Sequence, residues 1–105
     1  MMDFLVEIDV RLPPDTVPDR KAELVAAEAA RAKELAAQGL IYRLWRIPGR
    51  WANVGIWRAD DATALHEAIS SLPLYPWLEV EVTPLAQHPS DPTPSDPPPS
   101  YPAAG

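Results

Sequence analysis

Two short motifs in the middle of the chain hold most of the side chains with chemical potential. The first, at 44–53, reads Leu-Trp-Arg-Ile-Pro-Gly-Arg-Trp-Ala-Asn, and the second, at 72–77, reads Leu-Pro-Leu-Tyr-Pro-Trp. Arginine binds a carboxylate through several N–H donors, whereas tryptophan offers a broad apolar surface. Two arginines, two tryptophans and an asparagine around a Pro-Gly turn are more than a plain hairpin needs.

Glu28 is the carboxylate with the most unusual predicted surroundings. On a helix it would lie one turn after Leu24 and two turns before Leu35, near the middle of the apolar stripe. Burial would raise its pKa and a nearby arginine would lower it, so the balance decides whether it is a base near neutral pH. The structural alternative is an ion pair with Arg31 or with an arginine of the 44–53 motif.

The arginines and tryptophans of the first motif each have a plain interpretation beside the functional one. Arg46 is either an anion-binding residue or a side chain whose stem packs while its charge reaches solvent. Arg50 lies in the turn, where a solvated charge is the default. Trp45, Trp51 and Trp57 fit core or interface packing better than a ligand platform, because tryptophan buries a large area.

The two histidines do not predict a metal site. His66 falls at the edge of the apolar stripe of the second predicted helix, where an ordinary helix-edge histidine competes with an acid or base role. His66 and His88 lack a metal-ligand spacing, and the chain has no cysteine. No Gly-rich phosphate loop is present either. We predict neither a metal nor any other cofactor.

Size and charge limit the classes of partner. With 105 residues the chain is one small domain, which leaves much of its surface exposed unless it associates with itself. The net charge of −6 argues against nucleic acid. No run approaches the ~20 apolar residues of a membrane span, and the first residues do not resemble a signal peptide. We expect a cytoplasmic homo-oligomer that binds neither nucleic acid nor membrane.

The end of the chain differs in composition from the rest. Proline, serine and aspartate dominate residues 91–105, and Tyr101 is the single large apolar side chain there. Such a segment cannot bury enough surface to offset its ordering entropy. We predict a folded domain at 1–90 and a disordered tail at 91–105, with a docking peptide as the less favoured alternative.

Hydrophobic periodicity predicts the elements that position these residues. Alternation at 4–12 indicates a strand, the Ala- and Glu-rich stretch 19–38 indicates a helix ended by Gly39, and 41–47 and 51–57 indicate a hairpin. Asp60 or Asp61 would cap a helix that runs to about Ser71, and 78–83 alternates again. The order β-α-β-β-α-β is that of the ferredoxin-like α+β fold, a four-stranded antiparallel sheet with two helices on one face.

A three-residue hairpin loop would set which side chains share a face. In that register Trp45 lies opposite Asn53, and Arg46 faces the helices and Glu28 together with Ala52, Val54 and Ile56. Trp45, Ile47, Trp51 and Trp57 would then share the other sheet face and pack against a second subunit.

Taken together, the motifs resemble the muconolactone Δ-isomerase family over roughly residues 1–90. The resemblance rests on the 44–53 hairpin, the Leu65-His66 pair, the 72–77 turn and the closing His-Pro-Ser at 88–90. It implies a dimeric α+β barrel, assembled further into a decamer, that acts on a small lactone in catechol catabolism. It also implies Glu28 as the catalytic base with His66 as a second catalytic candidate. The implied substrate-binding residues are Arg46, Trp45, Arg50, Asn53 and Tyr75.

The activity implied by this resemblance is a cofactor-free shift of a ring C–C double bond, from (S)-muconolactone to 3-oxoadipate enol-lactone. Many members carry a lysine three residues before the glutamate, where this chain has Val25. That departure indicates a different lactone or weak activity on muconolactone. The alternatives are a cofactor-free monooxygenase or cyclase of the same barrel type, and a non-catalytic oligomer that binds small ligands. A pocket with Glu28 and an arginine favours proton transfer over these alternatives.

Overall fold

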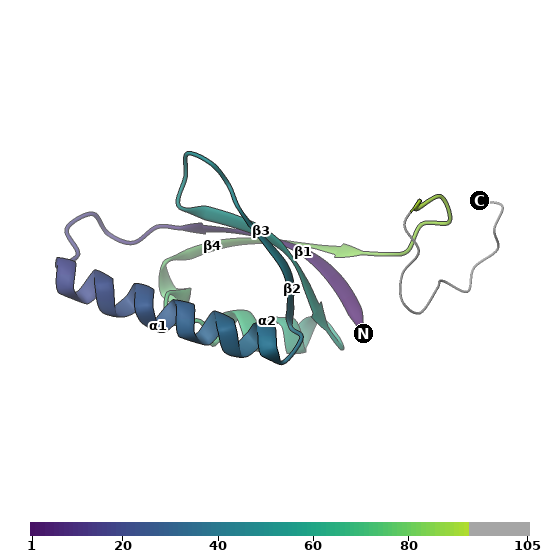
Figure 1. The fold of residues 1–105 in the computed structure, drawn as a ribbon, viewed down its shortest axis with the longest axis horizontal. Coiled ribbons are helices and arrows are strands. Elements are labelled where there is room, and N and C mark those ends of the chain that lie inside the picture. Colours follow the sequence, from purple (N-terminus) through teal and green to yellow (C-terminus); the bar gives the residue numbers. More distant parts are fainter. Residues whose placement is uncertain (93–105) are drawn as a thin grey trace.

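The chain folds in the predicted order of strands and helices. A computed structural model describes residues 1–92; the predicted tail at 91–105 lies almost wholly outside the described residues. The elements are β1 (Met2–Val10), α1 (Pro18–Ala37), β2 (Ile41–Arg46), β3 (Ala52–Ala59), α2 (Ala62–Ser70), the 3-10 turn η1 (Tyr75–Trp77) and β4 (Leu78–Leu85). The strands form one antiparallel sheet in the order β2-β3-β1-β4, and both helices lie on one face of it (Figure 1). The ferredoxin-like fold is confirmed.

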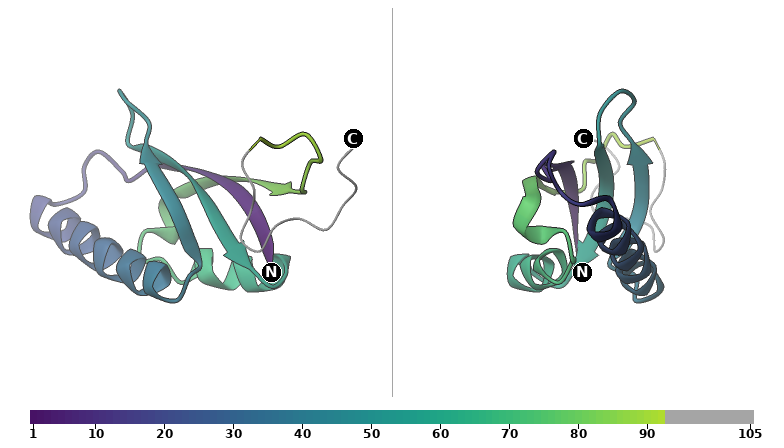
Figure 2. Two further views of the ribbon diagram at one scale, coloured as in Figure 1. Left: turned by 45° about the vertical axis from the view of Figure 1, so that its right-hand side comes forward. Right: turned by 90° about the vertical axis from the view of Figure 1, so that its left-hand side faces the viewer.

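The sheet face beneath the helices carries the core. Phe4, Val6 and Ile8 alternate along the central strand β1 and are buried. Leu35 of α1 and Leu65 and Ile69 of α2 pack against them in one cluster. Figure 2 shows the two helices side by side under the sheet, while the tip of the β2–β3 hairpin projects beyond it. Burial of these apolar side chains is therefore what fixes both helices to one face.

Local signals set the ends of both helices. Pro18 occupies the first turn of α1, where its missing N–H costs nothing. At the other end Gly39 has φ +83° and, with Leu40, donates to the carbonyls of Ala36 and Leu35 in a Schellman motif. Asp61 caps α2 by accepting a 2.8 Å hydrogen bond from the Ala64 N–H. Within residues 1–92, neither helix has the length and apolar character needed to cross a membrane.

The hairpin register differs from the predicted one. Ile47 N–H donates to the Ala52 carbonyl at 3.1 Å, so the loop holds four residues instead of three. The fourth is Trp51, whose carbonyl accepts a hydrogen bond from Val10 of β1 rather than from β2. Arg46 therefore lies opposite Asn53, and the predicted Trp45–Asn53 pair is wrong.

One extra loop residue reverses which β3 side chains face the helices, because alternate strand residues point to opposite faces. Asn53 and Trp57 lie opposite Ile8 and Phe4 of the core face. Arg46 faces the helices as predicted. Ala52, Val54 and Ile56, which were predicted to share this face with Arg46, do not share it.

The placement of Trp57 on the open sheet face is likewise wrong, because its side chain is 1% exposed in the core. Trp45 lies on the edge strand β2 and is 44% exposed, and Arg43 lies 4.7 Å from its ring centre.

Candidate active site

A cavity of about 390 Å³ lies between α1, the sheet and the turn that follows α2. Apolar side chains from these elements, among them Ile8, Val25 and Leu44, form most of its wall. Its charged and amide-bearing members are Glu28, Arg46 and Asn53. The long helix and the first motif of the sequence thus supply one site, and a mainly apolar wall strengthens charge interactions inside it.

Glu28 is half-buried in this cavity and is held by the backbone. Its Oε1 accepts a 3.0 Å hydrogen bond from the Leu74 N–H, which belongs to the 72–77 motif. Burial raises the pKa of Glu28, and the hydrogen bond from Leu74 opposes this shift without cancelling it. Arg31, the predicted structural partner, instead binds Glu34 at 3.2 Å and Ser71 at 3.0 Å. One carboxylate oxygen is fixed, which leaves Oε2 to accept a proton.

Arg46 and Asn53 form a pair across the hairpin. They are directly opposite in the β2–β3 ladder and both line the Glu28 cavity. Within residues 1–92, the Arg46 guanidinium has no ion pair, and the buried Oδ1 of Asn53 has no hydrogen-bond donor. A guanidinium beside an amide presents several polar atoms that suit the carboxylate of a small anion.

The three tryptophans of the hairpin contribute to the wall in different ways. Trp45, Trp51 and Trp57 all line the cavity. Lys21 lies 5.1 Å from the ring centre of Trp51, a distance typical of a cation–π contact. Trp57 alone belongs to the buried core cluster. The wall is therefore aromatic at the hairpin side, and it is aliphatic along α1.

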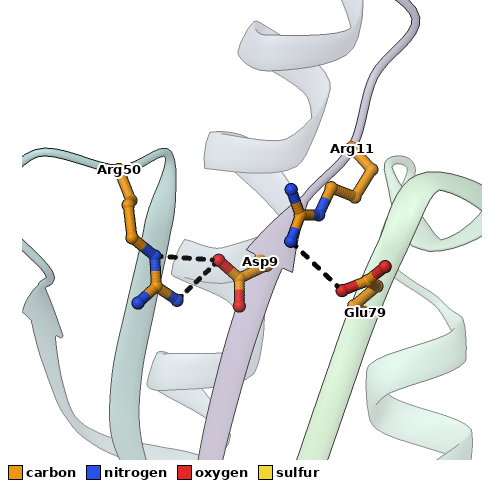
Figure 3. A network of polar contacts seen from close by, with 4 residues as sticks. All are labelled: Asp9, Arg11, Arg50 and Glu79. Carbon is orange, nitrogen blue, oxygen red and sulfur yellow. Dashed lines mark hydrogen bonds and ion pairs between the residues drawn. The ribbon is translucent and has the colours of Figure 1, made fainter.

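Arg50 is not brought to the cavity. Its Nη2 lies 2.7 Å from Asp9 Oδ1, and this ion pair ties the hairpin loop to β1 (Figure 3). The hydrogen bond and the charge of Asp9 raise the pKa of Arg50. A second ion pair, between Arg11 and Glu79 at 3.4 Å, lies beside it in the same view. The position of Arg50 indicates a role in fixing the loop.

His66 and Tyr75 lie in a second cavity. This space of about 650 Å³ is bordered by α2, η1 and β4, and the two rings meet edge to face with centres 6.3 Å apart. It is larger than the Glu28 cavity, but neither Glu28 nor Arg46 lines it. These are the two charged residues predicted to work together. We regard the smaller cavity as the candidate active site for that reason. Among residues 1–92 no cluster of His, Asp or Glu is arranged to hold a metal ion.

Two features of the site were missed by sequence reasoning. The Leu74 N–H is a backbone group, so no side-chain pattern marks it, although the Leu-Pro-Leu turn that positions it was noted as a motif. Trp57 was placed on the wrong face because its position depends on the loop length. The correct face of Trp57 follows only when the number of residues in the hairpin loop is known.

Comparisons with known proteins identify the family of the chain. Residues 2–91 match the family model described as muconolactone delta-isomerase. A muconolactone Δ-isomerase 2 from Acinetobacter lwoffii is 40% identical over 85% of this chain and 93% of its own length. A muconolactone Δ-isomerase from Rhodococcus opacus is 39% identical over 84% of this chain and 95% of its own length.

The fold comparison gives the same family. A crystal structure of muconolactone isomerase superposes with a TM-score of 0.83 at 36% identity, covering 90% of this chain and 98% of that one. The family model, the similar sequences and the matching fold therefore lead to one conclusion: the chain belongs to the muconolactone Δ-isomerase family.

Proposed function

We propose that this chain isomerises a small lactone that carries a carboxylate, (S)-muconolactone or a close analogue, to the corresponding enol-lactone in aromatic catabolism. The names of its relatives support this substrate class. The observation that carries the proposal is Glu28, a half-buried carboxylate in a mainly apolar cavity that also contains Arg46. This pair favours proton transfer over oxygenation or simple ligand binding.

The reaction moves one proton and one double bond. The Glu28 carboxylate removes a proton from a ring carbon, and the C–H electron pair spreads through the conjugated system to the lactone carbonyl oxygen. The protonated Glu28 then returns that proton to a second carbon, so no atom is gained or lost and no redox partner is required. A base held in place serves both steps, because holding it near both carbons replaces a bimolecular encounter.

Arg46 and Asn53 are proposed to bind the carboxylate of the substrate. Anchoring this group at the hairpin side would leave the ring toward α1, where Glu28 lies. Val25, on the same wall, adds an apolar group rather than a charge. The proposal thus assigns one anchor and one base to opposite sides of the cavity, with Trp45 and Trp51 as apolar contacts.

We further propose that the protein is a cytoplasmic homo-oligomer built from dimers, with a decamer as the largest assembly. The sheet favours association, because Leu5 of β1 is 37% exposed and Trp45 of the edge strand β2 is 44% exposed. Sedimentation at micromolar concentration would detect the assembly. If the protein sediments as a monomer, the proposed assembly is wrong and no second subunit contributes to the site.

Ultraviolet absorbance tests the activity itself. Muconolactone is added to the purified protein, and the conversion of the conjugated lactone is followed over time against a protein-free control. Enzyme-dependent loss of the conjugated chromophore is expected. An unchanged spectrum with muconolactone and with its methylated analogues would contradict the proposal.

A further inference from the structure

Trp57 carries a hydrogen-bond donor that the mechanism above does not use. Trp57 lies in the second half of β3, opposite Phe4 and Ile41, and lines the Glu28 cavity. Its indole Nε1–H is buried, and within residues 1–92 it has no acceptor. A buried donor without an acceptor costs free energy, and phenylalanine would fill much of the same space without that cost.

The buried side-chain polar atoms without partners in residues 1–92 all belong to residues that line this cavity. In the described part of the chain they are two, Trp57 Nε1 and Asn53 Oδ1. Both belong to β3 residues on the core face, and both residues line the Glu28 cavity. Unsatisfied groups on residues that line one cavity, which Glu28 also lines, indicate where a polar ligand would complete the hydrogen bonding.

We propose that Trp57 Nε1–H donates a hydrogen bond to the ring carbonyl oxygen of the lactone. This inference rests on the proposed function and names a third group for the same reaction. The carbonyl oxygen gains negative charge when Glu28 removes the ring proton, so a donor already in place stabilises the intermediate more than the substrate. The indole keeps its proton throughout, and only the strength of the hydrogen bond changes. Trp57 is in this sense a catalytic residue.

Trp57→Phe tests the kinetic consequence. It keeps an aromatic ring in the core and removes the donor, so kcat should fall by roughly 100-fold with a much smaller change in KM. Trp77→Phe is the matched control, because Trp77 lies in η1 and does not line the cavity. A Trp57→Phe variant with the kcat of the wild type would overturn the inference while leaving the isomerase proposal intact.

A binding measurement tests the contact without relying on turnover. In wild-type protein labelled with ¹⁵N-tryptophan, the Trp57 indole N–H resonance is identified by its loss in the Trp57→Phe variant, or by elimination using the other tryptophans if that variant does not fold. The saturated lactone 5-oxotetrahydrofuran-2-acetate should move this resonance downfield. Tetrahydrofuran-2-acetate, which lacks the ring carbonyl, should not.

The two measurements separate the possible failures. If the wild type does not turn over muconolactone but the saturated lactone shifts the Trp57 resonance, the proposed function fails and the contact stands. If the resonance does not respond to the saturated lactone, the inference is wrong whether or not the enzyme is active.

Discussion

Glu28 Oε1 accepts a hydrogen bond from the Leu74 N–H across a distance of 3.0 Å, and this contact joins α1 to the 72–77 motif across 46 positions of the sequence. It explains why a Leu-Pro-Leu turn accompanies a glutamate on the long helix. Pro73 and Pro76 restrict the backbone of the turn, which holds the Leu74 N–H in position. Among residues 1–92 no positive side chain forms an ion pair with Glu28, so the backbone orients the carboxylate and no such pair lowers its basicity.

The raised pKa of Glu28 predicts a pH-dependent stability. The folded pKa exceeds the ordinary value of 4.5, so the folded state binds this proton more tightly than the unfolded state does. The wild type should therefore lose stability relative to Glu28→Gln as pH rises from 4.5 through the folded pKa. The amide oxygen of the substituted glutamine can still accept the Leu74 hydrogen bond.

Melting temperatures at several pH values between 4 and 8 measure this effect. The exposed Glu23 on the same helix provides the control Glu23→Gln, which removes a carboxylate that does not line the cavity. A Glu28→Gln difference that does not grow with pH would show that burial does not penalise the charged form.

Replacing Arg46 should weaken substrate binding. Arg46→Met keeps a long side chain and removes the charge, so KM should rise by ~10-fold or more while kcat changes less, as expected for lost binding that is equal in ground and transition states. Arg43→Met is the matched control, because Arg43 is on the same strand and does not line the cavity. Equal effects of both substitutions on KM would point to a general charge effect.

Gly55 is required by the close approach of β2 and β3. A Cβ at this position would collide with the Arg43 carbonyl oxygen and lie 2.9 Å from Leu44 Cδ1. Gly55→Ala should cost about 1–3 kcal/mol through overpacking. In a domain of this size that cost corresponds to a decrease of roughly 4–8 °C in Tm per kcal/mol, which calorimetry would measure. An unchanged Tm would mean that the strand pair relaxes freely.

Deletion of residues 91–105 should leave the fold intact. The composition of this segment offers no alternating or helical apolar pattern, so its removal exposes no core surface. Thermal melting and sedimentation of the shortened chain would check this. A Tm lower by several degrees would show that the tail packs against the domain.

The sequence predicted the fold because each element carried its own signal. Alternation at Phe4, Val6 and Ile8, the Gly39 helix end and the Asp61 cap depend on neighbouring residues alone. Glu28 could be placed on the inner face of its helix by the same local reasoning. The hairpin register could not, because it depends on where β1 binds the Trp51 carbonyl, a contact between residues 41 positions apart.

The site was therefore predicted in part. Glu28, Arg46, Trp45 and Asn53 line one cavity, whereas His66 and Tyr75 lie in another and Arg50 binds Asp9. Local patterns show which face a helical residue takes, but grouping residues into one cavity requires the long-range packing of helices and turn. The role of each residue stays a prediction.

The central claim is that Glu28 transfers the proton, and the turnover of Glu28→Gln tests it most directly. This substitution keeps the shape and the Leu74 hydrogen bond and removes the basicity, so isomerisation of muconolactone, followed by ultraviolet absorbance, should fall by ~100-fold or more. Glu23→Gln should retain the activity of the wild type, and both variants should bind substrate and keep their oligomeric size. Turnover of Glu28→Gln close to that of the wild type would contradict the account and leave His66 as the next candidate for the base.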